Sequence, residues 1–112
     1  MAETIFTKII AKQIPARIAH EDDKYIAIHD IHPQAPVHLL IIPKKPIPTL
    51  HDLEPADAEL VGGMFLLADK LMRSMGHGDY RTIFNNGRGA GQEVMHIHLH
   101  VLAGRPFGWP PG

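Results

Sequence analysis

Three histidines, His96, His98 and His100, stand at alternate positions near the end of the chain, separated by aliphatic residues. Strict alternation over 96–102 predicts a β-strand, because successive side chains of a strand point to opposite faces. The three imidazoles would then share one face, with neighbouring α-carbons roughly 6.8 Å apart. The other face would be buried by the intervening residues Ile97, Leu99 and Val101.

A row of imidazoles has three interpretations, and the residues alone leave all three open. It can act on a phosphate, with the middle imidazole as nucleophile and its neighbours holding charge or orientation. It can bind a metal, although His96 and His100 would lie roughly 13.6 Å apart. Since Zn–N bonds are about 2.0–2.1 Å long, at most two of the three could share an ion with a distant ligand. Third, the strand can be purely structural.

The composition limits what the rest of the chain can do. The 112 residues predict one domain, 1–112, of 45% hydrophobic and 21% charged residues with net charge −1. This charge gives no basic surface for nucleic acid. Cysteine is absent, which excludes disulfides and thiolate metal sites. The first residues lack a secretory signal pattern, and no apolar run is long enough to span a membrane, so we expect a cytoplasmic protein.

Several elements are needed to hold the histidine row. A short helix is predicted over 4–11, and the polar turn 21–24 predicts a hairpin between strands at 17–20 and 25–30. The apolar run 37–43 predicts a central strand. A long helix should follow Pro55, with Asp52 or Glu54 as its N-cap, because apolar residues recur at steps of three and four up to Met75.

Three further features are candidates for chemistry. Asp30 stands between a predicted strand and a loop stiffened by prolines, where a carboxylate could accept from ribose hydroxyls or simply close a turn. His38 lies within the central strand and gains importance if it faces the histidine row. A strand predicted over 80–85 leads into a loop with glycines at 87, 89 and 91. Its main-chain N–H groups could form an anion-binding nest, or it could be a plain loop.

The run from His96 to Leu102 resembles the defining motif of the histidine-triad family of nucleotide-binding proteins. The resemblance covers essentially the whole chain and is greatest for the Hint branch, the purine nucleoside phosphoramidases. The supporting segments include Thr4-Ile5-Phe6, His29-Asp30-Ile31, Pro33-Gln34-Ala35-Pro36, Ile42-Pro43-Lys44-Lys45, Gly91-Gln92 and Trp109-Pro110-Pro111-Gly112.

This resemblance implies an α+β fold of the histidine-triad type: a five-stranded antiparallel sheet with one long and one short helix, in a homodimer. His98 would be the nucleophile, supported by His38 and His96, and Asp30 would bind the ribose. The base would be surrounded by Phe6, Ile9, Ile28, His29, Ile31 and Leu40. The α-phosphate would contact Asn85, Gly91, Gln92, Glu93 and His100. Some family members have serine at the position of Glu93, and a carboxylate beside a phosphate is unfavourable unless it points away.

The implied activity is hydrolysis of the P–N bond of purine nucleoside phosphoramidates through a nucleotidyl-histidine intermediate, releasing AMP or GMP with no cofactor or metal. Other branches of the family cleave dinucleoside polyphosphates or transfer a nucleotidyl group. Two alternatives of another class are a non-catalytic nucleotide-binding or scaffold protein, and a zinc-binding regulator that uses His38 with two histidines of the row.

Overall fold

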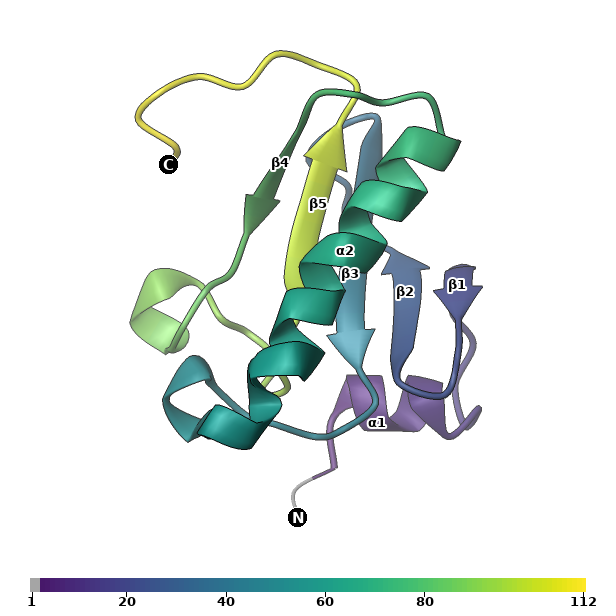
Figure 1. The fold of residues 1–112 in the computed structure, drawn as a ribbon, viewed down its shortest axis with the longest axis vertical. Coiled ribbons are helices and arrows are strands. Elements are labelled where there is room, and N and C mark those ends of the chain that lie inside the picture. Colours follow the sequence, from purple (N-terminus) through teal and green to yellow (C-terminus); the bar gives the residue numbers. More distant parts are fainter. Residues whose placement is uncertain (1–2) are drawn as a thin grey trace.

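The computed structural model describes residues 3–112; Met1 and Ala2, part of the segment in which we looked for a signal, lie outside them. Its centre is a five-stranded antiparallel sheet in the order β1-β2-β3-β5-β4 (Figure 1). The strands are β1 (Ile18–Glu21), β2 (Tyr25–His29), β3 (Val37–Pro43), β4 (Tyr80–Ile83) and β5 (Leu99–Ala103). This arrangement confirms the expected fold class, with the apolar strand β3 at the centre.

The hairpin between β1 and β2 is closed by an aspartate, as the polar turn predicted. Asp22 Oδ1 accepts hydrogen bonds from the backbone N–H groups of Lys24 and Tyr25, each over 2.8 Å. Such local bonds are the reason that aspartate favours turns. The turn brings β2 alongside β3, so that Ile28 pairs with Leu40 in the middle of the sheet.

The two helices lie on opposite sides of the sheet (Figure 1). The helix α1 (Ile5–Ile10) begins at Thr4, whose hydroxyl accepts from the N–H of Thr7. The helix α2 (Ala58–Ser74) runs diagonally across the other face. Our prediction of Asp52 or Glu54 as its N-cap is wrong. Two 3₁₀ turns, Leu50–Asp52 and Pro55–Asp57, precede the helix, and Asp52 closes the first of them by accepting from Thr49 N–H.

Two hydrophobic clusters hold these layers together. Between α2 and the sheet, the predicted helical stripe is buried at Met64, Leu67, Ala68, Leu71 and Met72, whereas Met75 is exposed. Between α1 and the sheet, Phe6 and Ile9 pack on apolar side chains of β2 and β3. Because the side chains of a strand alternate, the face of β5 that carries His100 looks toward the side of α1.

The predicted extent of the histidine strand is wrong at its beginning. The strand β5 starts at Leu99, so His96 and His98 precede it. Pairing with β3 ends at Ile41 opposite Leu99, since β3 itself ends at Pro43 and the chain turns away through prolines. The segment before Leu99 is held by single bonds instead, such as Ile97 N–H to Ile47 O at 2.8 Å. The alternation still holds: Ile97, Leu99 and Val101 belong to the cluster under α2.

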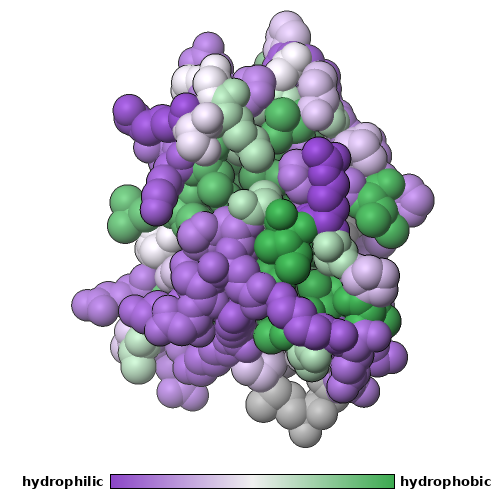
Figure 2. Space-filling view, turned by 90° about the vertical axis from the view of Figure 1, so that its right-hand side faces the viewer, coloured by the Kyte–Doolittle hydropathy of each residue, from purple (hydrophilic) through white to green (hydrophobic). Residues whose placement is uncertain are grey.

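The surface beside β1 is mostly hydrophilic, with hydrophobic side chains gathered in separate patches (Figure 2). Within residues 3–112, we find no helix of the length and apolar character needed to cross a lipid bilayer.

Candidate active site

A cavity of about 540 Å³ lies between α1, the sheet and the loops at the ends of β2 and β4. Its walls include thirteen of the fifteen predicted site residues: Phe6, Ile9, Ile28, His29, Asp30, Ile31, His38, Leu40, Asn85, Gly91, Glu93, His98 and His100. His96 and Gln92 are the two that do not line it. The tertiary structure thus brings together residues from both ends of the chain.

His98 is held in one orientation by the backbone. Its ring Nδ1 lies 2.8 Å from the carbonyl oxygen of His96, and since a carbonyl can only accept, Nδ1 carries the proton. The other nitrogen, Nε2, therefore keeps its lone pair. The edge of the Phe6 ring packs against the imidazole at 4.9 Å between centroids. His98 is only 8% exposed, and burial lowers its pKa, so it stays uncharged at neutral pH.

His96 supports this arrangement from outside the cavity. Its ring Nε2 donates to the carbonyl oxygen of Pro43 over 2.7 Å, and the side chain is 1% exposed. This bond anchors the segment before β5 to the end of β3, while the carbonyl oxygen of His96 orients His98. The support expected of His96 therefore comes from its backbone as well as from its ring. Burial lowers its pKa, which keeps this imidazole neutral too.

His38 and His100 belong to a chain of hydrogen bonds that starts at the backbone N–H of Gln34. This donor determines which ring nitrogens of the two histidines carry protons. The backbone N–H of Gln34 donates to His38 Nδ1 over 3.1 Å. Because Nδ1 accepts, the proton of neutral His38 is on Nε2, which lies 2.9 Å from His100 Nδ1 and donates to it. His100 then carries its own proton on Nε2. Sequence reasoning missed the part of Gln34, because a backbone donor leaves no signal in residue type.

Burial keeps this pair of imidazoles uncharged. The pKa of His100 is lowered from 6.5 to about 4, first by burial and then by the neighbouring rings of His98 and His38. Burial likewise lowers the pKa of His38, opposed by the carboxylate of Asp30. Of the imidazoles of His38, His98 and His100, that of His98 therefore offers a lone pair to the cavity and that of His100 offers an N–H donor, at adjacent positions of the same face.

Asp30 closes a turn, which is one of the two roles considered for it, and it also lines the cavity. One carboxylate oxygen accepts from the backbone N–H of His32 over 2.8 Å, which closes the turn after β2. The other lies 3.5 Å from His38 Nε2. The residue lines the cavity beside its apolar walls, which leaves the carboxylate available to a polar group of a bound molecule.

Asp30, His38 and His100 offer ligand atoms within 4.8 Å of one another, close enough to share a metal ion. The zinc hypothesis took two histidines of the row together with His38, and in this respect it is wrong, because only His100 converges with His38. An ion at this point would also have to replace the hydrogen bond between the two rings.

The structure gives Gln92 a role other than the predicted phosphate contact. Its amide donates to the carbonyl oxygens of Pro48 and Val94 over 2.7 and 3.1 Å, and its Oε1 accepts from Gly87 N–H over 2.8 Å. The side chain is 2% exposed and lies away from the cavity. A phosphate contact would require these bonds to break, so Gln92 serves to fix the loop.

The anion nest predicted for the glycine loop is also largely absent from the described residues. Gln92 N–H donates to Gly87 O, Gly91 N–H donates to Arg88 O, and Ala90 N–H donates to Gly87 O. Glycine is required at two of these positions, where φ is +90° at Gly87 and +96° at Gly91. The loop thus uses most of its N–H groups to hold its own shape, which places Asn85 and Glu93 at the cavity wall.

Comparisons with known proteins identify the family of this chain. The sequence matches the HIT domain over residues 11–107. An uncharacterized HIT-like protein of Synechocystis sp. is 54% identical over 114 residues, covering 100% of both chains. The crystal structure of a HIT family hydrolase from Legionella pneumophila has 48% identity and a TM-score of 0.95, covering 98% of this chain and 100% of its own. A HIT family hydrolase from Clostridium thermocellum has 39% identity and a TM-score of 0.92, covering 96% of each chain. The chain therefore belongs to the HIT domain family.

Proposed function

We propose that the protein hydrolyses purine nucleoside phosphoramidates, the activity of the Hint branch, with His98 as the nucleophile. The observation that carries this proposal is the state of His98, whose Nδ1 is bound to a carbonyl and whose Nε2 lone pair is free beside an open cavity. A neutral imidazole in this state can attack phosphorus. The Phe6 ring packs edge-on against this imidazole and limits how it can turn.

The walls of the cavity suit a nucleotide. Apolar side chains from α1, β2 and β3 would pack against a purine base: Phe6, Ile9, Ile28 and Leu40. The free carboxylate oxygen of Asp30 would accept from the ribose hydroxyls. A nucleotide bound in this way would present its α-phosphate to His98 and His100, which line the same cavity as Asp30.

The reaction then proceeds in two steps. His98 Nε2 forms a bond to phosphorus as the P–N bond breaks, and the amine nitrogen takes up one proton from solvent. The His98 ring becomes a cation, stabilised by its Nδ1–H bond to His96 O. His100 Nε2–H donates to a phosphoryl oxygen throughout. Water next attacks phosphorus, which releases the nucleoside monophosphate, returns one proton to solvent and restores neutral His98.

The alternatives within the family use the same nucleophile and differ in the leaving group. A non-catalytic nucleotide-binding protein would need the same walls without the use of the His98 lone pair. Turnover decides between these possibilities.

The test is release of amine from an adenosine phosphoramidate in the presence of a chelator. We expect turnover by the native protein and its loss in His98→Ala, with AMP still bound. His51→Ala, which changes an exposed histidine on a 3₁₀ turn, is the matched control. Acid-quenched native protein should carry a labile nucleotidyl adduct. Unchanged activity in His98→Ala would refute the assignment of the nucleophile, and activity lost only to chelator would favour the metal hypothesis.

We also infer a homodimer formed through α2 and β4. The strand β4 is at an edge of the sheet, and no strand within residues 3–112 pairs with its outer side. On α2, Phe65 and Leu66 are 43% and 75% exposed, an apolar surface suited to a second copy of the chain. Trp109 is 86% exposed, so its own subunit leaves this large ring uncovered. Light scattering of the native protein and of Leu66→Glu tests this, with a monomeric native protein as the contrary result. The cytoplasm remains the predicted location.

A further inference from the structure

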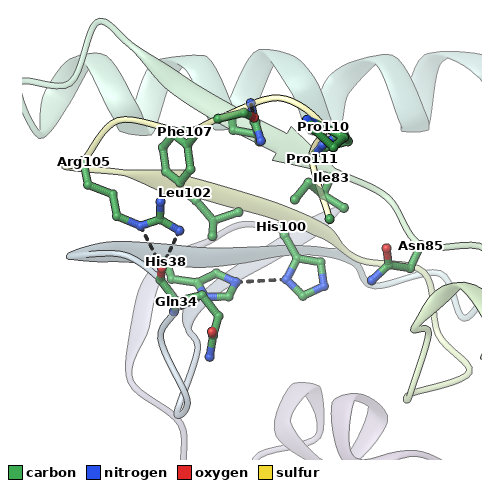
Figure 3. A pocket seen from close by; sticks show the side chains of 13 residues that line it. Gln34, His38, Ile83, Asn85, His100, Leu102, Arg105, Phe107, Pro110 and Pro111 are labelled. Atoms are coloured by element: carbon green, nitrogen blue, oxygen red, sulfur yellow. Dashed lines mark hydrogen bonds between the residues drawn. The ribbon is translucent and has the colours of Figure 1, made fainter.

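A second cavity, of about 490 Å³, adjoins the first on the same face of the sheet. The C-terminal segment 107–112 forms one wall, and β4 and β5 form its floor (Figure 3). Four residues line both cavities: Gln34, His38, Asn85 and His100. The two spaces therefore meet at the pair of hydrogen-bonded imidazoles.

The order of side chains along β5 places the second cavity beyond the reacting centre. His98 lines only the first cavity, His100 lines both, and Leu102 lines only the second. In a displacement at phosphorus, the attacking and leaving atoms lie roughly in line on opposite sides. A phosphate attacked by His98 and held by His100 would therefore direct its leaving group toward the second cavity.

The charged side chains that line this cavity have one sign. Of the described residues, Arg81 and Arg105 line it, and no Asp or Glu side chain does. Within residues 3–112, neither guanidinium forms an ion pair with a carboxylate. Both stack on the ring of Phe107, with their central carbons 5.3 and 4.3 Å from its centroid. An anionic group entering the cavity would meet two unneutralised cations.

The two arginines differ in whether their side-chain nitrogens already donate hydrogen bonds within the protein. All three nitrogens of Arg105 are engaged: Nε and Nη2 donate to Gln34 O, and Nη1 donates to Pro106 O. Arg105 thus ties the C-terminal segment to the loop that orients His38 (Figure 3). In Arg81, only Nη2 is bound, to Gly108 O over 2.8 Å. Its Nε–H and Nη1–H groups have no partner among the described residues, so Arg81 is the one able to bind a ligand.

The sheet register sets the distance between Arg81 and the reaction. Ile83 pairs with His100, and Arg81 pairs with Leu102, one step farther along the same face. That step is about 6.8 Å, and a long guanidinium side chain can cover much of it. The carboxylate of an amino acid joined to phosphorus through its amino group lies only a few bonds from the breaking P–N bond, within this span.

We propose that the second cavity is a leaving-group subsite for amines that carry a carboxylate, and that Arg81 is its specificity-determining residue. This rests on the proposed phosphoramidase function. The substrates of this class are nucleoside phosphoramidates in which the nitrogen belongs to an amino acid with a free carboxylate. As the P–N bond breaks, the amino nitrogen takes up one proton and the carboxylate stays unchanged on Arg81.

The experiment compares two substrates that differ in one charge: AMP joined through nitrogen to glycine, and the methyl ester of the same compound. The measured quantity is the ratio of kcat/KM for the acid to that for the ester. We expect the native protein to prefer the acid, and Arg81→Gln to lower the ratio by about tenfold or more, as for loss of a charge-assisted bond. Arg81→Lys should restore part of the ratio, because it keeps the charge without the planar fork. Arg73→Gln, which removes a guanidinium paired with Asp69 on α2, should leave it unchanged.

The ratio separates recognition from folding, because a disturbed C-terminal segment would lower both rates together. If Arg81→Gln lowers kcat/KM equally for the acid and the ester, the proposal is overturned. Arg81 would then have only a structural role, through its hydrogen bond to Gly108 O. Equal cleavage of both substrates by the native protein would overturn the subsite while leaving the phosphoramidase function intact. If the native protein cleaves neither of these substrates nor the simple adenosine phosphoramidate, both the subsite and the phosphoramidase function are overturned.

Discussion

His38 Nε2 donates a hydrogen bond to His100 Nδ1 over 2.9 Å, across neighbouring strands and between residues 62 positions apart in the chain. Gln34 N–H fixes the direction of this bond by occupying the other nitrogen of His38. Its consequence is that His100 presents a proton, and not a lone pair, to the cavity. The proton that His100 presents therefore depends on His38, which need not touch the phosphate.

The first prediction concerns this bond. His38→Phe removes the donor, so His100 Nδ1 is left unpaired and the ring can turn or change its tautomer. We expect kcat for phosphoramidate hydrolysis to fall about ten- to a hundredfold, the range for an unsatisfied buried group, with KM little changed. Steady-state kinetics measure both constants. Control substitution of the exposed His51 by Phe should leave them unchanged, and a wild-type kcat in His38→Phe would show that the relay is dispensable.

The second prediction concerns the pH dependence of stability. Burial lowers the pKa of His38, His96, His98 and His100 below the ordinary value of 6.5. Below pH 6.5 the unfolded chain therefore binds protons that the folded chain does not. The contribution of these neutral imidazoles to the free energy of unfolding is therefore fully present above pH 6.5. It is lost as the pH falls through their pKa values in the folded protein, which is about 4 for His100.

Urea unfolding between pH 7 and pH 5 measures this effect, in a range where most carboxylates remain ionised. We expect the free energy of unfolding to decrease as pH falls. The slope should be smaller in His100→Gln and the same in His51→Gln. A free energy that stays constant over this range would contradict the buried, neutral state of the four imidazoles.

The third prediction concerns Glu93. It lines the nucleotide cavity, where its carboxylate would repel the α-phosphate of a bound substrate. Glu93→Gln should raise kcat/KM for an adenosine phosphoramidate by about two- to tenfold, a modest effect because the side chain is exposed. Glu59→Gln, an exposed carboxylate on α2, is the matched control. An unchanged kcat/KM would mean that the Glu93 side chain points away from bound phosphate.

The fourth prediction concerns packing of α2 on the sheet. A Cβ at Gly63 would overlap with the hydroxyl of Tyr25, which donates to Leu60 O over 2.6 Å. Gly63→Ala should destabilise the protein by about 1–3 kcal/mol, as overpacking does. Gly62→Ala in the same helix meets nothing within 4 Å and should be neutral or stabilising by up to about 1 kcal/mol. Denaturant unfolding measures both, and Tyr25→Phe should relieve part of the cost in the double variant.

Much of the fold follows from local patterns in the sequence. Alternation predicts the faces of β5, the polar turn at Asp22 predicts the first hairpin, and the three-four periodicity predicts the buried stripe of α2. These predictions succeed because each depends on neighbouring residues or on the period of one element. The histidine-triad resemblance supplied what periodicity cannot, namely the five-stranded arrangement and the site residues collected around His98.

Only the tertiary structure decided how those residues share the work. Backbone partners set the proton positions of the histidines, since Gln34 N–H and His96 O each reach a ring through the fold. The same partners explain the predictions that were wrong. The Gln92 side chain is buried because its amide donates to the carbonyl oxygen of Pro48 and accepts from Gly87 N–H. The strand β5 starts only at Leu99 because its partner β3 ends at Pro43. Residue type and spacing determine which groups are present, whereas distances between segments far apart in the chain determine which atoms are free to react.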